Sequence, residues 1–213
     1  PAREPAAGQG HMRCTGTPAL ARGRCRRFCN GEGGVSCASP QHCRALPVLS
    51  MTTVLLSLGS NVQPECHLAS ALRALQAQFG PLTVSCAYRT PAVGFDGPAF
   101  LNNAVAIDCD WPLARIEDWL HGLEDAHGRD RSGPKFSDRT LDVDVVFLGD
   151  TVIIEDGRQR IPRPELAHAF VLQPLADIAP DFIDPVSGRS LAQLWQAHRQ
   201  YGQAVETVAL PSA

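Results

Sequence analysis

Two aspartates spaced two residues apart are the residues of this chain best suited to chemistry. Asp142 and Asp144 alternate with Val143 and Val145 at the start of an apolar run. Side chains alternate along a strand, so the carboxylates point to one face and the valines to the other, into the core. Adjacent carboxylates repel each other, and divalent cations between them relieve that repulsion. Because Mg²⁺ keeps places for water and phosphate oxygens, the pair predicts a phosphate-binding metal site.

Four cations in the segment before the pair narrow this interpretation. They are Arg129, Arg131, Lys135 and Arg139. An Asp-x-Asp sequence alone is more often the solvated side of an amphipathic strand. Cations, metal ligands and a glycine- and proline-bearing loop are together typical of phosphoryl transfer, in which catalysis depends on positioning and charge neutralisation.

The elements that must position these residues follow in a regular order from Met51. Apolar runs predict strands at 54–58, 82–88, 100–109 and 141–148, and helical spacing predicts helices at 64–79 and 112–127. The order strand, helix, strand, strand, helix, strand predicts an α+β, ferredoxin-like split βαβ core, an antiparallel sheet with both helices on one face. We expect smaller elements at 152–154, 166–178, 191–198 and 204–209. This fold hosts many functions and does not select one.

The charge of the chain is unevenly distributed. Residues 1–50 carry seven Arg and two acids, a net charge of +5. The whole chain has a net charge of −3, so residues 51–213 have a net charge of −8. An acidic body argues against nucleic-acid binding, which needs a basic face. An RNA-binding domain of the same fold class would also need exposed aromatics on that face. No apolar run approaches the length of a membrane span, so we expect no membrane partner.

The first fifty residues differ from the rest in composition. They are rich in Arg, Gly, Pro and Ser, show no sustained periodicity, and hold five of the eight cysteines at spacings unlike a zinc ribbon. We expect 1–50 to be a disordered or non-native leader and 51–213 to be the functional domain. Cys66, Cys86 and Cys109 lie singly in apolar surroundings and are expected to be core or half-buried residues of a reduced, cytoplasmic protein.

Six landmarks along residues 53 to about 198 carry a family resemblance. They are Leu58–Asn61, Tyr88–Pro91, Phe100–Asn103, Glu124 with Gly128, Arg129 and Arg131, Arg139–Asp144, and Phe170–Leu175. Each is weak alone, but in this order they resemble the 6-hydroxymethyl-7,8-dihydropterin pyrophosphokinase family. The resemblance implies transfer of the terminal diphosphate of ATP to the hydroxymethyl group of a reduced pterin, with release of AMP, in folate biosynthesis. It also implies two Mg²⁺ ions, ATP as co-substrate and small-molecule partners only, and we expect a monomer.

The same resemblance assigns roles to individual residues. Those implied to bind the pterin are Thr90, Pro91, Val93, Phe100, Asn102 and Phe170. Those implied to bind the nucleotide are Glu124, Arg131, Lys135, Arg139, Arg158, Arg163 and His168. Those implied to act in catalysis are Arg129, Arg131, Arg139, Asp142 and Asp144, the two aspartates as metal ligands. Loops 89–99 and 129–139 are expected to become ordered on binding ATP and Mg²⁺.

Four positions depart from the family pattern. Lys135 and Phe136 stand where an arginine and a tryptophan are usual, Arg163 where a histidine is usual, and His168 where an arginine is usual. Charge near the phosphates is therefore redistributed. A noncatalytic or repurposed relative that binds pterin or nucleotide remains an alternative, as does another Mg²⁺-dependent phosphotransferase.

Overall fold

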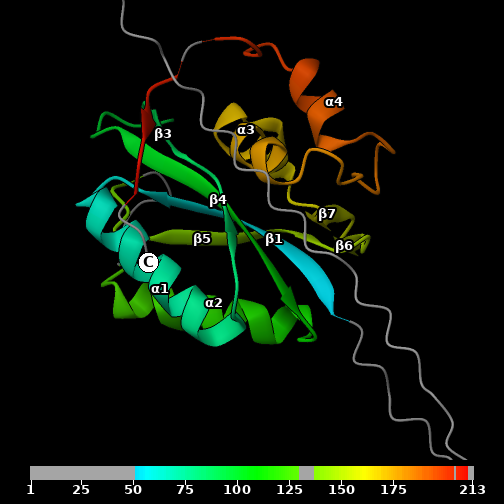
Figure 1. Ribbon diagram of the computed structural model, residues 1–213, viewed down its shortest axis with the longest axis horizontal. Coiled ribbons are helices and arrows are strands. Elements are labelled where there is room, and N and C mark those ends of the chain that lie inside the picture. The colour runs from blue at the N-terminus through cyan, green and yellow to red at the C-terminus, as the bar shows by residue number, and fades with distance from the viewer. Residues whose placement is uncertain (1–50, 130–136, 204, 211–213) are drawn as a thin grey trace, which may run out of the picture. The chain divides into compact units, whose positions relative to one another are not determined.

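An antiparallel sheet forms the centre of the folded part of the chain (Figure 1). The computed structural model describes residues 51–129, 137–203 and 205–210, all within the second of two units, Pro1–Leu46 and Pro47–Ala213. Within these residues the sheet has six strands: β1 (Thr52–Ser60), β2 (Thr83–Val84), β3 (Ala87–Thr90), β4 (Phe100–Cys109), β5 (Asp142–Leu148) and β8 (Thr207–Val208). The order is β5-β1-β4-β3-β8, with β2 also paired to β4. This order confirms the predicted split βαβ core.

Two helices cover one face of the sheet, as predicted. They are α1 (Pro64–Phe79) and α2 (Leu113–Ala126). In α1, Leu68, Leu72 and Leu75 recur at helical spacing and are buried against alternate residues of β1, so burial of this stripe stabilises the helix. The helix begins at a proline and is followed by Gly80 at a φ of 82°, which favours glycine.

A second helical layer covers the opposite face. It comprises α3 (Ala169–Ile178) and α4 (Leu191–Gln196), preceded by a 3₁₀ turn, η1 (Pro164–Ala167), and the hairpin β6 (Ile153–Glu155) and β7 (Arg158–Ile161). Leu55, Phe147 and Leu175 are fully buried in the cluster beneath these helices. Figure 1 shows the two helical pairs on opposite sides of the sheet. The sequence predicted these C-terminal helices but not the face they cover.

A bulge interrupts the pairing of β5 with β1. Leu56 pairs with Val145 and Leu55 with Phe147, so Val146 is an extra residue on β5. Asp142, Asp144 and Val146 follow the normal alternation and face the α3 side. The extra residue turns Phe147 to that side as well, where its ring lies 4.9 Å from that of Phe182.

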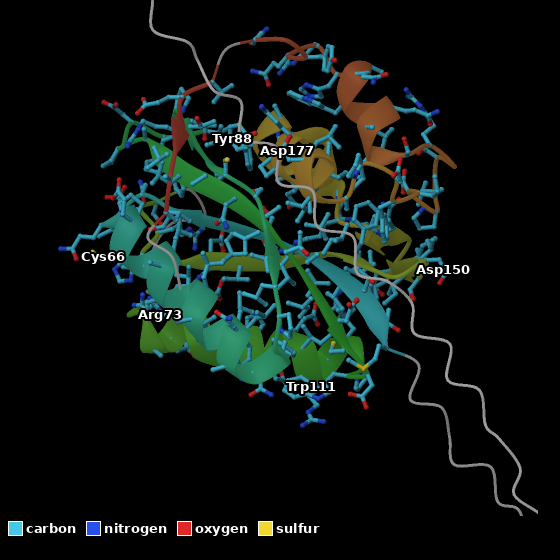
Figure 2. All side chains as sticks on the ribbon, viewed as in Figure 1. Cys66, Arg73, Tyr88, Trp111, Asp150 and Asp177 are labelled. Atoms are coloured by element: carbon cyan, nitrogen blue, oxygen red, sulfur yellow. The ribbon has the colours of Figure 1, made fainter. Side chains whose placement is uncertain are left out.

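The structure corrects two expectations. The predicted strand 82–88 is divided into β2 and β3, because the pairing with β4 slips by one residue at Ser85 and Cys86. Of the three cysteines in the described ranges, only Cys109 is buried, and Cys66 and Cys86 are exposed. Cys66 lies in the first turn of α1, outside its buried stripe, as Figure 2 shows. Within the described ranges, no helix is both long and apolar enough to cross a membrane.

Candidate active site

A cleft of about 560 Å³ opens on the side of the sheet that carries α3. Most residues predicted for the site line it: Thr90, Pro91, Val93, Phe100, Asn102, Arg129, Arg139, Asp142, Asp144, Arg163, His168 and Phe170. They come from β3, β4, β5, α3 and the segments between them, so the fold brings together positions that are up to eighty residues apart in the chain.

Four predicted residues are not placed in this cleft. Glu124 is buried behind β5, with 3% of its side chain exposed. Arg158 lies on β7 and lines a neighbouring concavity of about 580 Å³, which shares Arg163 and Glu165 with the cleft. Arg131 and Lys135, like the departure at Phe136, lie outside the described residues.

The two aspartates of β5 enter the cleft side by side, and each pairs with its own arginine. Arg129 binds Asp142 and Arg163 binds Asp144, with 35% and 34% of the respective aspartate side chains exposed. Burial and the charge of Asp142 raise the pKa of Asp144 to about 6, although Arg163 opposes the shift. Because the carboxylates repel each other, a cation shared between them stabilises the ionised pair.

These carboxylates fit a hard divalent cation. Among the residues that the structure describes, no group of three or more His, Cys, Asp or Glu side chains is arranged to enclose a metal ion. Mg²⁺ does not need such an enclosure, because it binds through one or two carboxylates and takes its other oxygens from water and phosphate. Two adjacent, partly exposed carboxylates in a cleft satisfy this requirement.

Another part of the cleft combines the aromatic rings of Phe100 and Phe170 with a polar floor, formed by Asn102 and Thr90. The Asn102 amide is 6% exposed and its Nδ2 donates to Thr90 Oγ1 at 2.8 Å. Phe100 is half-buried beside it, and the Phe170 ring stacks on His168 at 5.0 Å with 11° between their planes. Aromatic faces and an amide that both donates and accepts suit a flat heterocycle with a hydrogen-bonding edge.

Gly59 provides room for this floor. It follows Leu58 on β1 and pairs with Asn102 of β4. A β-carbon at this position would lie 2.8 Å from Asn102 Oδ1 and 3.8 Å from the Phe100 ring, and the first distance is too short for any side chain. The glycine is therefore needed for a close approach, not for an unusual backbone angle.

The buried turn after β1 fixes the segment before the aspartates. Asn61 Oδ1 accepts from the backbone N–H of Arg139 at 2.7 Å, and its Nδ2 donates to Asp138 at 2.8 Å. Ser60 Oγ donates to the carbonyl oxygen of Thr140 at 2.6 Å. These bonds set the backbone position of Arg139, which the sequence analysis predicted for the site without identifying what holds it.

Several residues that line the cleft were not predicted from the sequence. They are Ser57, Gly59, Phe95, Ser137, Val146, Glu165 and Val171. A signal existed for the first two, since they alternate with the buried Leu56 and Leu58 and so share the face of the aspartates once β1 is placed beside β5. For Glu165 and Val171 there was none, because their proximity depends on how the C-terminal layer packs.

Comparison with known sequences identifies relatives across most of the folded region. The family model described as 7,8-dihydro-6-hydroxymethylpterin-pyrophosphokinase (HPPK) matches residues 55–180. A 2-amino-4-hydroxy-6-hydroxymethyldihydropteridine pyrophosphokinase of Synechocystis is 34% identical over 159 residues, covering 73% of this chain and 76% of the relative. The protein of that name from Pseudomonas aeruginosa is 34% identical over 149 residues, covering 68% of this chain and 90% of the relative.

Solved structures show the same fold. A Plasmodium falciparum HPPK-DHPS with pteroate has a TM-score of 0.51 at 13% identity, over 74% of this chain and 46% of the solved chain. An HPPK-DHPS in complex with substrates has a TM-score of 0.52 at 12% identity, over 69% and 43%. This chain thus spans a little under half of those solved chains, and the likeness concerns the fold alone. The family match and the sequence relatives show that the chain belongs to the 7,8-dihydro-6-hydroxymethylpterin-pyrophosphokinase family.

Proposed function

We propose that this chain transfers the terminal diphosphate of ATP to the hydroxymethyl group of 6-hydroxymethyl-7,8-dihydropterin in folate biosynthesis. One observation carries the proposal: a single cleft joins an aspartate pair flanked by arginines to an aromatic pocket with an amide floor. The first part suits metal-bound phosphates and the second suits a pterin ring. Membership of a pyrophosphokinase family supports the reaction that connects them.

In the proposed reaction, the hydroxymethyl oxygen attacks the β-phosphorus of ATP. The new oxygen–phosphorus bond forms as the bond from that phosphorus to the α,β-bridging oxygen breaks. AMP leaves with the bridging oxygen, and the hydroxyl proton is released. No side chain needs to form a covalent intermediate. The protein positions the two substrates and neutralises the charge that moves towards the leaving phosphate.

The arginines supply much of that neutralisation. When bound by Asp142 and Asp144, Mg²⁺ would add positive charge beside the phosphate oxygens. Arg129 and Arg163 would compete with a cation for these carboxylates, so a bound metal would release Arg163 from Asp144, and Arg129 from one of its two carboxylates, to meet phosphate. Arg139 lies in the same cleft, and a planar bidentate guanidinium suits phosphate.

Two departures from the family pattern acquire a proposed role. Arg163, in the segment before η1, donates its guanidinium N–H to the Asp144 carboxylate. His168 stacks on Phe170 and so backs one aromatic side of the pterin pocket. Compared with the family pattern, an arginine is present at position 163 instead of position 168. The aspartate pair and the aromatic pocket are kept.

The test is AMP release by the full chain supplied with ATP, Mg²⁺ and the reduced pterin. We expect AMP only when pterin and metal are both present, and Asp142→Ala should lower the rate by about a hundredfold or more. Asp150→Ala is the matched control, because this exposed acid lies in the turn just after β5. Tight pterin binding without AMP would instead identify a noncatalytic relative, and activity that survives EDTA would remove the metal from the proposal.

A further inference from the structure

The last turn of α2 holds a buried acid directly behind the metal-binding strand. Glu124 is 3% exposed, whereas the next residue, Asp125, is exposed. The side chain of Glu124 does not line the cleft that contains Asp142 and Asp144. A buried carboxylate needs hydrogen-bonding and charged partners, and those of Glu124 lie on the strand and on the segment that follows α2.

The first partner is the backbone of β5. In the described part of the chain β5 is an edge strand, so the N–H groups on its outer side have no neighbouring strand to bind. The N–H of Val143 points to that side and donates to Glu124 Oε1 at 2.9 Å. Val143 lies between the two aspartates, so this bond fixes the backbone from which both metal-binding carboxylates project.

The second partner is Arg129. Its backbone N–H donates to the Glu124 carbonyl oxygen at 3.1 Å, and its guanidinium donates to the Glu124 carboxylate, to the Asp142 carboxylate and, at 3.3 Å, to the Leu141 carbonyl oxygen. Burial alone would lower the pKa of Arg129, but Asp142 and Glu124 raise it above its usual value. Glu124 therefore shares this cation with a metal-binding carboxylate.

We propose that Glu124 is a positioning residue for the metal-binding pair and touches neither nucleotide nor pterin. It fixes the open edge of β5 at Val143 and gives Arg129 a second anion. When a metal takes Asp142, Arg129 keeps its partner in Glu124, so the metal displaces only one of two ion pairs. The inference rests on the proposed function, and it replaces the nucleotide contact that family resemblance implies for this residue.

The isosteric variant Glu124→Gln separates the two parts of this role. Its amide oxygen still accepts from Val143, but the charge shared with Arg129 is lost, so Arg129 competes more strongly with the metal. We expect Mn²⁺, titrated without nucleotide and followed by electron paramagnetic resonance, to bind about fivefold more weakly. In Glu124→Ala, exchange of the Val143 amide hydrogen should also become about fivefold faster. The matched control is Asp118→Asn, an exposed acid of α2 whose loss changes the net charge equally.

Kinetics distinguish positioning from contact. For Glu124→Gln we expect kcat to fall while KM for the pterin is unchanged. A raised KM for ATP with unchanged Mn²⁺ affinity would overturn the proposal in favour of a nucleotide contact. Unchanged Mn²⁺ affinity in Glu124→Gln together with unchanged Val143 exchange in Glu124→Ala would overturn it outright. If Glu124→Ala does not fold, Val143 exchange in Glu124→Asp, which shortens the side chain, provides the same test.

Failure of the proposed function would look different. Absence of AMP release by the unaltered chain would contradict the proposed reaction. The Mn²⁺ and amide-exchange measurements do not depend on turnover, so they would still decide whether Glu124 positions the aspartate pair.

Discussion

At the residue scale, the candidate site pairs each of two neighbouring carboxylates with its own arginine. Asp142 binds Arg129 and Asp144 binds Arg163, so neither carboxylate relies on the other's partner. The sequence predicted their common face because alternation along a strand is a local property. It did not predict Arg163 as the partner of Asp144, because that pairing depends on the segment before η1 lying along β5, where the Arg163 N–H donates to the Val146 carbonyl oxygen.

The raised pKa of Asp144 predicts a pH dependence of stability. Its pKa of about 6 exceeds the usual 3.8, so the folded protein binds this proton more tightly than the unfolded chain does. The free energy of unfolding of the metal-free protein should therefore fall as pH rises from about 4 to about 6. Asp144→Asn should remove this contribution. As the pH rises through this range, the stability of the variant should therefore increase relative to that of the unaltered protein. Urea unfolding in EDTA measures the difference.

Saturating Mg²⁺ is the control for that prediction. A bound cation favours the ionised carboxylate, so it should abolish the fall in stability of the unaltered protein. A difference between variant and unaltered protein that is the same at pH 4.5 and pH 7 would contradict the assignment to Asp144.

Gly59 provides a second test at this scale. A methyl group at Gly59→Ala would meet Asn102 Oδ1 and force the amide away from Thr90. We expect pterin affinity, measured by fluorescence titration, to fall about tenfold through the loss of correctly placed hydrogen bonds. Gly122→Ala is the matched control, because no atom lies within 4 Å of an added methyl group there. Equal pterin affinity in both variants would show that the floor tolerates a side chain.

At the element scale, prediction succeeded where the signals were local. The bounds of α1 were foreseen because Pro64 and Gly80 mark its ends and Leu68, Leu72 and Leu75 define its face. The break between β2 and β3 was not foreseen, because the one-residue slip at Ser85 is visible only beside β4. The position of α3 was not foreseen either, since an apolar stripe does not say which face of a sheet it covers.

One hydrogen bond links the elements that carry the two sides of the proposed pterin pocket. The buried Tyr88 of β3 donates its hydroxyl to Asp177 of α3, and Figure 2 shows the two side by side. β3 also carries Thr90, and α3 carries Phe170. Tyr88→Phe should lower the free energy of unfolding by about 1–2 kcal/mol and weaken pterin binding, because α3 is then less firmly fixed. Urea unfolding and pterin titration measure the two effects.

Tyr201→Phe is the control for this link. Tyr201 is 53% exposed, so loss of its hydroxyl should change stability by less than about 0.5 kcal/mol. A Tyr88→Phe protein with the same stability and pterin affinity as this control would show that β3 and α3 are fixed by apolar packing alone.

At the scale of the whole molecule, the described elements form a three-layer arrangement with separate apolar clusters on the two faces of the sheet. Within the described part, both clusters are built from residues between Val54 and Leu210. Composition predicts a folded domain that begins near Met51, because helical and strand periodicity begin only there.

This division predicts the behaviour of a shortened chain. We expect residues 51–213 alone to match the full chain in melting temperature and in AMP release, and to elute as a monomer in size-exclusion chromatography. The reason is that residues after Met51 supply all described members of both clusters and of the cleft lining. A shortened chain that unfolds at lower temperature, or that loses turnover, would show that residues 1–50 contribute to the active protein.

The bulge in β5 lets the strand carry one extra residue without changing which layer Asp144 and Phe147 face. Asp144 and Phe147 are three positions apart, and a regular strand would turn them to opposite faces. The extra Val146 lets both face the α3 side. Deleting Val146 would leave Asp144 and Phe147 two positions apart, and regular pairing would then keep both on the α3 side. β5 can therefore lose this residue without moving Asp142 and Asp144 to another layer, so the bulge accommodates an extra residue and is not required for the position of the aspartate pair.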